Sequence, residues 1–296
     1  MIKTFFKRYG TSYAFLLPWI FGILIFTLIP ILVSLYYSFT DFGLFKKPEW
    51  IGMTNYIEMF TRDARYIKSI KVTAIYVAVG VPLKLAFALL LAMILNKGMR
   101  GLVFFRAVYY VPSLLGGSVA VAILWRQVFG QSGVVNHLLG LIGIRSTTSW
   151  IAHPDYTLGV LIALMVWQFG SSMIIFLAGL KQVPIALYEA ADIDGAKGVS
   201  KFFRITLPMI SPVILFNLVM QTIQSFQVFT PAYIIGGPEG KPLDSILFYT
   251  LYLYTQGFSR LQMGYASAMA WMLLIVTALI TGLIFLTAKN WVFYED

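Results

Sequence analysis

The most informative stretch of the sequence runs Lys181-Gln-Val-Pro-Ile-Ala-Leu-Tyr-Glu-Ala-Ala-Asp-Ile-Asp-Gly-Ala-Lys-Gly-Val-Ser-Lys-Phe-Phe-Arg-Ile-Thr-Leu-Pro208. It lies between two long apolar segments, and its residue types favour a short helix that ends in a sharp turn. Pro184 suits the first turn of a helix, the residues after it are good helix formers, and Gly195 is a natural stop. We therefore predict a compact helical loop here.

The predicted short helix has the features of a docking element. Ala190 and Ala191 are small enough for another backbone to approach closely, and Glu189 offers a negative charge to a basic partner. A helix that lay on lipid headgroups would be enriched in Lys and Arg, whereas this one carries acidic residues and no basic ones. The loop is therefore expected to bind a protein.

The rest of the chain is too apolar for a soluble protein. Of its 296 residues, 59% are hydrophobic and 11% are charged, whereas soluble domains carry about 45–50% and about 25%. Much of the surface must therefore face lipid, and an all-α polytopic membrane fold is expected. The absence of Cys excludes disulfides and cysteine nucleophiles, and two His residues argue against a histidine-rich metal site. The net charge of +10 fits Lys and Arg on cytoplasmic loops better than nucleic-acid binding.

Six apolar segments are long enough to cross a membrane as helices. A helix needs roughly 20 mostly apolar residues to span about 30 Å of hydrocarbon. The segments cover residues 13–39, 70–95, 107–129, 157–180, 209–235 and 263–288. We expect a single transmembrane domain over residues 1–296, with residues 181–208 as a loop between the fourth and fifth spans.

The basic residues predict the orientation of these spans. The shortest connector, residues 96–106, carries Lys97, Arg100 and Arg106 and no acidic residue, and the N-terminal segment is basic as well. Lys and Arg are retained on the cytoplasmic side of a membrane. Both termini, and therefore the loop at residues 181–208, are expected in the cytoplasm.

The same loop carries a family signature. The signature begins with an acidic residue and two alanines, has a glycine after three further residues, and ends in Ile-x-Leu-Pro after nine more. The residues that match it are Glu189, Ala190, Ala191, Gly195, Ile205, Leu207 and Pro208. This order resembles the EAA signature of binding-protein-dependent ABC importer permeases. The Asp194-Gly195-Ala196 and Leu207-Pro208 variants resemble the sugar branch of that family, typified by the maltose-transporter permeases.

The resemblance implies a type I ABC importer permease with six transmembrane helices in a bacterial or archaeal cell membrane. Its EAA loop would be a coupling helix in a cleft of a cytoplasmic ATPase, with Glu189 facing a basic residue there. The implied partners are a second permease, two ATPase subunits, an extracytoplasmic solute-binding protein and a sugar, such as an oligosaccharide. The chain itself has no phosphate-binding P-loop sequence, so ATP and Mg would be bound by the ATPase, and the permease would be neither an enzyme nor a cofactor protein.

Polar side chains on the fifth span predict a substrate pathway. At about 100° per residue, four of them fall within an arc of roughly 100° on an otherwise apolar helix. They are Asn217, Gln221, Gln224 and Ser225. Amides and hydroxyls would supply donors and acceptors to a sugar without net charge. Hydrogen bonding between spans is the alternative explanation.

Two further features of the spans are candidates for the same pathway. The fourth span carries Gln168 and Ser171 on one face beside Trp167, and here pathway and interhelical bonding are equally open. Lys84 is the one ionisable residue well inside a predicted span, so a carbonyl, an anion or a water-filled cavity is expected next to it. A structural pair and the carboxylate of a sugar both remain open as its role.

Other classes of protein fit the sequence less well. A secondary transporter or channel would have inverted repeats, buried acids or a filter sequence, and no predicted span contains an acid. An intramembrane enzyme would need a catalytic constellation that the spans lack. Within ABC permeases, one for a non-sugar solute is the remaining alternative.

Overall fold

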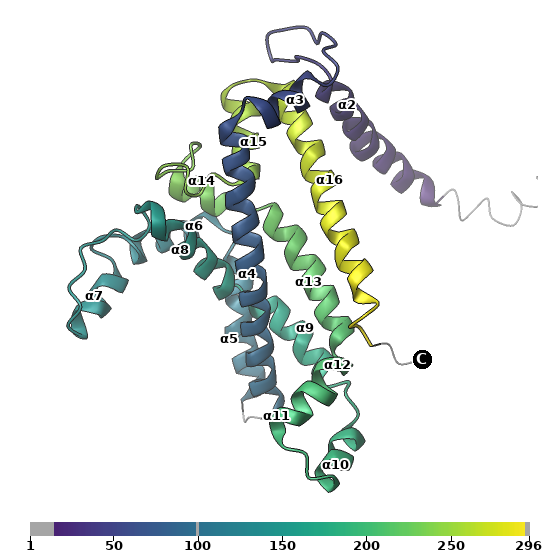
Figure 1. Cartoon of the computed structure of the whole chain (residues 1–296), viewed down its shortest axis with the longest axis vertical. Coiled ribbons are helices and arrows are strands. Elements are labelled where there is room, and N and C mark those ends of the chain that lie inside the picture. Colours follow the sequence, from purple (N-terminus) through teal and green to yellow (C-terminus); the bar gives the residue numbers. More distant parts are fainter. Residues whose placement is uncertain (1–14, 99–100, 294–296) are drawn as a thin grey trace, which may run out of the picture. The chain divides into compact units, whose positions relative to one another are not determined.

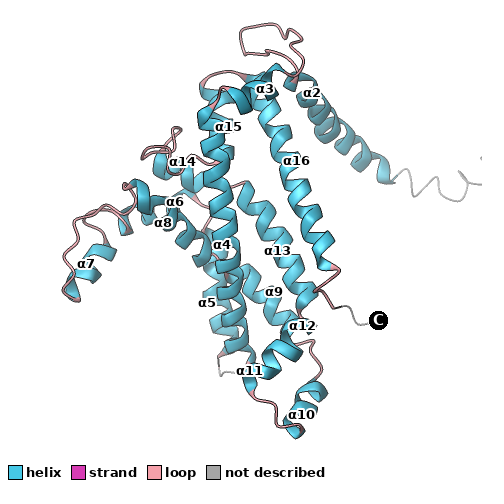
Figure 2. Cartoon of the chain, viewed as in Figure 1, coloured by secondary structure: helices cyan, strands magenta, loops and turns pink. Residues whose placement is uncertain are grey.

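The computed structural model describes residues 15–98 and 101–293, and its regular secondary structure there is entirely helical (Figure 2). Two isolated β-bridges, Thr40 with Trp50 and Gly43 with Lys46, occur in these ranges, and no strand does. The predicted all-α class is confirmed. The basic N-terminal segment, the first two residues of the predicted first span, Arg100 and the last three residues lie outside the described ranges.

Figure 1 labels the helices in chain order. Among the described residues, π-helical geometry occurs at η1 (Leu24–Leu28), η2 (Phe202–Thr206) and η3 (Thr255–Ser259). The α-helices are α2 (Ile29–Ser38), α3 (Thr54–Thr61), α4 (Ala64–Asn96), α5 (Leu102–Leu115), α6 (Val119–Val128), α7 (Val134–Leu141), α8 (Pro154–Trp167), α9 (Gly170–Leu180), α10 (Ile185–Ile193), α11 (Gly198–Lys201), α12 (Leu207–Met209), α13 (Ser211–Phe226), α14 (Thr230–Gly236), α15 (Tyr249–Tyr254) and α16 (Met263–Ala288).

The chain divides into two compact units, each of which is described by itself. Unit 1 consists of Met1–Arg62 and Gln256–Met272, and unit 2 of Asp63–Thr255 and Leu273–Asp296. Helix α16 therefore contributes its first residues to unit 1 and the remainder to unit 2.

Unit 1 is held together at the end of α2. The side-chain amide of Asn55 in α3 donates to the carbonyl oxygens of Ser38 and Thr40, both at 2.9 Å. The hydroxyl of Tyr56 donates to Ser38 Oγ at 2.9 Å. Because a buried polar group must be hydrogen-bonded, these contacts fix α3 against the turn that ends α2.

Helix α4 is the central element of unit 2. It has 33 residues, which at a rise of 1.5 Å per residue gives a length of about 50 Å, and it packs against α8, α9, α13 and α15. Its buried apolar residues recur at spacings of three and four, as expected for one face of a helix. They include Val81, Leu85, Ala88, Ala92 and Leu95.

Within residues 15–98 and 101–293, four helices are long and apolar enough to cross a membrane, judged by length and composition. They are Phe15–Ser38, Ala64–Asn96, Ser211–Gly236 and Met263–Ala288. The last coincides with the segment expected at residues 263–288. Two more candidates are pairs of helices bent at a break, which raises the number of spans to at most six in the described residues.

Both bent pairs lie where a single membrane-spanning segment was expected. The segment at residues 107–129 consists of α5 and α6, which meet at 98°, and the segment at residues 157–180 consists of α8 and α9, which meet at 43°. The sharper bend has a local cause in the pair Gly116-Gly117, which favours an interruption. Ser118 then caps α6, since its Oγ accepts a hydrogen bond from Val121 N at 3.3 Å.

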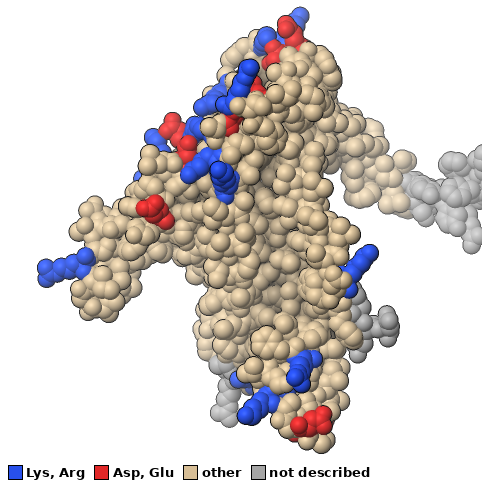
Figure 3. Space-filling view, viewed as in Figure 1, with Lys and Arg blue, Asp and Glu red and all other residues tan. Residues whose placement is uncertain are grey.

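Charged residues gather at two places on unit 2 (Figure 3). One group lies over α10 and α11, and the other lies near the first turns of α4, while the surface along the middle of α4 carries no charge in this view. An uncharged surface on a long apolar helix is typical of contact with lipid hydrocarbon.

The contact between α5 and α9 is tight enough to test. A Cβ on Gly170, the first residue of α9, would lie 2.3 Å from Tyr109 O and 2.8 Å from Tyr110 Cα. Gly170→Ala should therefore destabilise the protein by about 1–3 kcal/mol, because the backbone of α5 must move. The measurement is the thermal unfolding midpoint of the purified protein.

Gly159→Ala in α8 is the matched control for that substitution. Gly159 has no heavy atom within 4 Å of its Cβ position, so alanine should be neutral there or stabilise the helix by up to about 1 kcal/mol. Equal unfolding midpoints for the two variants would contradict the close packing of α5 on α9.

Candidate functional site

The predicted loop at residues 181–208 forms a defined helical structure. Pro184 caps the start of α10, and Gly195, with φ of +72°, ends it. Gly195 N donates to Asp192 O at 3.1 Å and Ala196 N donates to Ala191 O at 2.9 Å. These two bonds make a Schellman motif, in which a residue with positive φ closes the helix and satisfies its last carbonyl groups.

Side-chain bonds connect α10 to the segment that follows. The hydroxyl groups of Tyr188 and Thr206 lie 2.8 Å apart and share a hydrogen bond, and Lys201 forms an ion pair with Asp192. Thr206 is buried at the end of η2. The loop is therefore a folded unit with α10 held against η2.

Apolar side chains and an acidic residue are exposed on this loop. Ile185, Ile193 and Val199 are 73%, 88% and 72% exposed. Glu189 is exposed too, and it forms no ion pair with any residue in the described ranges. Large apolar side chains that are exposed on a folded element are typical of a surface that binds a protein partner. Its other predicted contact residues are Ala190, Ala191, Asp194, Ala196, Leu207 and Pro208, of which Ala190 and Asp194 are exposed and the rest are half-buried.

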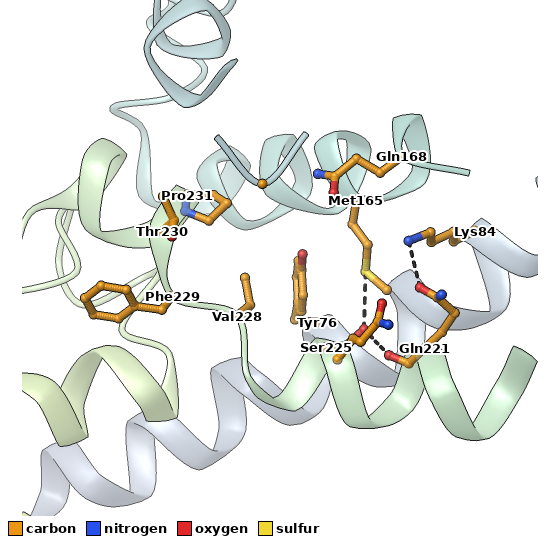
Figure 4. Close-up of a pocket in the computed structure, with 12 residues that line it drawn as sticks. Tyr76, Lys84, Met165, Gln168, Gln221, Ser225, Val228, Phe229, Thr230 and Pro231 are labelled. Carbon is orange, nitrogen blue, oxygen red and sulfur yellow. Dashed lines mark hydrogen bonds between the residues drawn. The ribbon is translucent and has the colours of Figure 1, made fainter. Parts of the chain in front are cut away.

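The second candidate region is a cavity of about 230 Å³ inside unit 2. It brings together Lys84 from α4, Gln168 from the break between α8 and α9, and three residues of α13 (Figure 4). Its full lining is Tyr76, Lys84, Gly117, Met165, Gln168, Gln221, Gln224, Ser225, Val228, Phe229, Thr230 and Pro231.

Three of the four residues predicted on the α13 stripe line this cavity. They are Gln221, Gln224 and Ser225. Asn217 does not line it, although it is 1% exposed. Its side-chain amide donates to Val213 O of its own helix at 3.1 Å. The structure therefore divides the stripe into a cavity part and a residue bonded within the bundle.

Lys84 contacts the stripe directly. Its Nζ donates to Gln221 Oε1 at 2.7 Å, as Figure 4 shows, and the residue is 7% exposed. Gln221 lies one helical turn from Ser225, whose Oγ donates to Gln221 O at 2.6 Å. The buried cation thus has a side-chain carbonyl oxygen as its partner.

The residues predicted on the fourth span lie around the helix breaks. Gln168 lines the cavity, while its Nε2 donates to Gly116 O at 3.2 Å and to Leu164 O at 3.3 Å. Ser171 N donates to Ser113 Oγ at 2.9 Å. Trp167 packs its ring 5.5 Å from that of Trp125. Ser171 and Trp167 therefore contact neighbouring helices and not the cavity.

Two aromatic residues of the cavity were missed by sequence reasoning. Tyr76 lies on α4, eight residues before Lys84, and Phe229 follows the α13 stripe. The ring of Phe229 stacks on that of Tyr233 at 5.4 Å. Tyr76 could have been predicted to line the cavity from its spacing to Lys84 along one helix. No sequence feature distinguishes Phe229 from the many other aromatic residues.

Comparisons with known proteins agree on the family. A family model described as "Binding-protein-dependent transport system inner membrane component" matches residues 5–290. The chain is 55% identical over 285 residues to the "Probable ABC transporter permease protein YesP" of Bacillus subtilis (strain 168), which covers 96% of this chain and 92% of that one. It is 32% identical over 291 residues to the "Lactose transport system permease protein LacF" of Rhizobium radiobacter, which covers 96% of each.

A solved structure has the same fold. It is a chain of the "bacterial alginate ABC transporter in complex with alginate pentasaccharide-bound periplasmic protein", which aligns with a TM-score of 0.84 and 25% identity over 96% of each chain. The resemblance inferred from the EAA motif is thereby confirmed, and so is the importer-permease fold. With its several apolar helices the protein is a multi-pass membrane protein and a transport subunit. It belongs to the family of inner membrane components of binding-protein-dependent transport systems, the permeases of ABC importers.

Proposed function

We propose that this permease carries oligosaccharides through the cavity of unit 2. The observation that carries the proposal is a cavity lined by the side-chain amides of Gln168, Gln221 and Gln224 inside an apolar helical unit. Amides offer donors and acceptors without charge, which suits the hydroxyl groups of a sugar. Phe229 adds an aromatic surface for the apolar face of a sugar ring. The lactose transport system permease, and the alginate transporter solved in complex with an alginate pentasaccharide-bound periplasmic protein, support this substrate class.

The size of the cavity supports passage through a shared pathway. Pockets that enclose a whole drug-sized ligand measure about 300–1,000 Å³, whereas this one is about 230 Å³. It would hold one part of an oligosaccharide, with the remaining surface supplied by a second permease in a heterodimer. The alternative is a permease for a non-sugar solute. Oppositely charged side chains in place of the amides would have favoured that alternative.

The loop around α10 is proposed to couple transport to ATP hydrolysis. Glu189, with Ala190 and Ala191, would enter a cleft of a cytoplasmic ATPase, one of two such subunits that bind ATP and Mg. The exposed apolar residues of α10, and Glu189, which forms no ion pair within the part of the chain that the structure describes, support this role. A solute-binding protein would deliver the sugar from the other side of the membrane, as in the periplasmic-protein complex of the solved relative.

The coupling role fixes the proposed orientation in a bacterial or archaeal cell membrane. A loop that binds a cytoplasmic ATPase must lie in the cytoplasm, and the purely basic connector at residues 96–106 supports the same side. Both termini would then be cytoplasmic.

Reversal of the charge at Glu189 tests the coupling surface. Glu189→Lys replaces an anion that meets a basic cleft by a cation, so like charges oppose each other there. Sugar uptake by the complex in vesicles, and the amount of ATPase that copurifies, should each fall by about tenfold or more.

Glu58→Lys is the matched control for charge reversal, because Glu58 is also exposed on a short helix, α3, outside the loop. Retention of ATPase by Glu189→Lys at the level of this control would remove α10 as the coupling helix.

The conformation of Gly195 gives a second test of the loop. Its φ of +72° is unfavourable for a β-branched residue, while its Cβ position has no neighbour within 4 Å. Gly195→Val should therefore cost about 1–2 kcal/mol of local stability through the backbone alone, and it should reduce sugar-stimulated ATP hydrolysis.

Two variants separate backbone strain from the addition of a side chain. Gly195→Asn should be milder, since Asn tolerates positive φ, and Gly198→Val adds the same side chain at the start of α11, where φ is not positive. Equal ATPase activity in Gly195→Val and Gly198→Val would show that the turn is not required.

Cysteine labelling tests the cavity as a pathway, because the native chain has no Cys. Gln221→Cys and Gln224→Cys should react with a water-soluble maleimide, since both residues line the cavity. Asn217→Cys, which is buried outside it, and Phe216→Cys, which is 53% exposed on the apolar side of α13, should not. Equal labelling of all four positions would favour hydrogen bonding between helices as the role of the stripe.

A further inference from the structure

Lys84 lies deep in unit 2 and cannot reach water by extending along its helix. It is the twenty-first of the 33 residues of α4, about 30 Å from one end of the helix and about 18 Å from the other at 1.5 Å per residue. The side chain is 7% exposed and faces α13. An ammonium group at such a depth requires compensation from its surroundings.

The compensation that the described residues provide is incomplete. Lys84 Nζ has one hydrogen-bond partner there, the neutral amide oxygen of Gln221, and it forms no ion pair in that part of the chain. An ammonium carries three donors. One amide bond therefore leaves two donors and the whole positive charge without a match.

The ammonium group of Lys84 borders the cavity and is not enclosed on all sides by packed side chains. Lys84 lines the cavity together with Gln168, Gln221 and Gln224, and none of the described residues that line it is acidic. In Figure 4, Lys84 and Gln221 lie together at one end of the lining and Phe229 lies at the other, with Ser225, Tyr76 and Val228 between them. The cavity therefore has a cationic end with an amide beside the cation, an uncharged middle and an aromatic end.

We propose that Lys84 binds the carboxylate of an acidic sugar, so that the oligosaccharides carried by this permease contain uronate residues. The inference rests on the proposed function, because it names the class of sugar that uses the same cavity. A carboxylate oxygen accepts a charge-assisted hydrogen bond from Lys84 Nζ. The amide nitrogen of Gln221, whose oxygen already accepts from Lys84, is a second donor to the same group.

The balance of charge favours a carboxylate over a phosphate. One ammonium group neutralises one negative charge, as a uronate has, whereas a phosphorylated sugar carries about −1.5 to −2 at pH 7. The described lining of the cavity has one cation. The sugar ring can still rest its apolar face against Phe229 while its hydroxyl groups bond to the amides.

The test compares one oligosaccharide with and without its charge. The complete importer, with its ATPase, second permease and binding protein, is reconstituted in vesicles. Uptake of trigalacturonate and of its fully methyl-esterified form is measured for the wild type, Lys84→Gln, Lys84→Arg and Lys71→Gln. The last is the matched control, since Lys71 is an exposed residue of the same helix and does not line the cavity.

Loss of the ammonium should affect the charged probe alone. Lys84→Gln should lower trigalacturonate uptake by about tenfold to a hundredfold, the range for a hydrogen bond to a charged group, and leave uptake of the ester within about twofold. Lys84→Arg should retain more activity than Lys84→Gln, and Lys71→Gln should match the wild type. The yield and unfolding midpoint of each complex should stay constant.

Three results would overturn the inference. The first is undiminished trigalacturonate uptake by Lys84→Gln. The second is a loss for both probes that follows the yield of the complex, which would make Lys84 a structural contact, including one with the second permease. The third is uptake by the wild type of the ester or another neutral oligosaccharide and of no acidic one. That result would overturn the role of Lys84 but leave the proposed function intact. A wild type that transports no oligosaccharide of either kind would instead refute the proposed function itself.

Discussion

The constraint on which this structure depends is that backbone N–H and C=O groups cannot remain unpaired in hydrocarbon. A continuous helix satisfies this constraint with its own hydrogen bonds, but the breaks between α5 and α6 and between α8 and α9 leave backbone groups that need other partners. Here the two breaks supply partners to each other: Ser113 Oγ donates to Gln168 O at 3.0 Å and accepts from Ser171 N at 2.9 Å. Gln168 Nε2 returns a bond to Gly116 O. Irregular backbone thus occurs where neighbouring helices satisfy it.

The same two breaks border the cavity. Gly117 and Gln168, one from each break, both contribute to its lining. Gln221, Gln224 and Ser225 of α13 line the same space. The amides are tolerated at this depth because each has a partner or borders the cavity. Polar residues and helix breaks are therefore two aspects of one arrangement.

Much of the fold could be predicted from the sequence, because lipid-facing helices are recognised by length and composition alone. Gly195 was recognisable as a helix stop since few residues adopt positive φ. The 98° bend between α5 and α6 could not be recognised from the sequence, because the Gly116-Gly117 pair is also compatible with a straight helix. Asn217 was predicted to line the substrate pathway with Gln221 because the two residues share a helix face. A face about 100° wide can border a cavity along one part and a neighbouring helix along another. The partner of Lys84, 137 residues away in sequence, depends on tertiary packing that periodicity does not encode.

The chain connects the cavity to the loop through helices and not through flexible segments. After α10 and α11, η2 continues into α12 and then α13 with one interruption at Ile210. That interruption is bonded on both sides, because Ser211 Oγ donates to Pro208 O at 2.5 Å and accepts from Phe293 N at 2.8 Å. On the other side the loop follows α9, whose Gly179 packs closely against Val213 of α13. Hydrogen bonds at Ser211 and close packing at Val213 therefore hold the start of α13 to its neighbours, and Gln221, which accepts from Lys84, lies farther along the same helix.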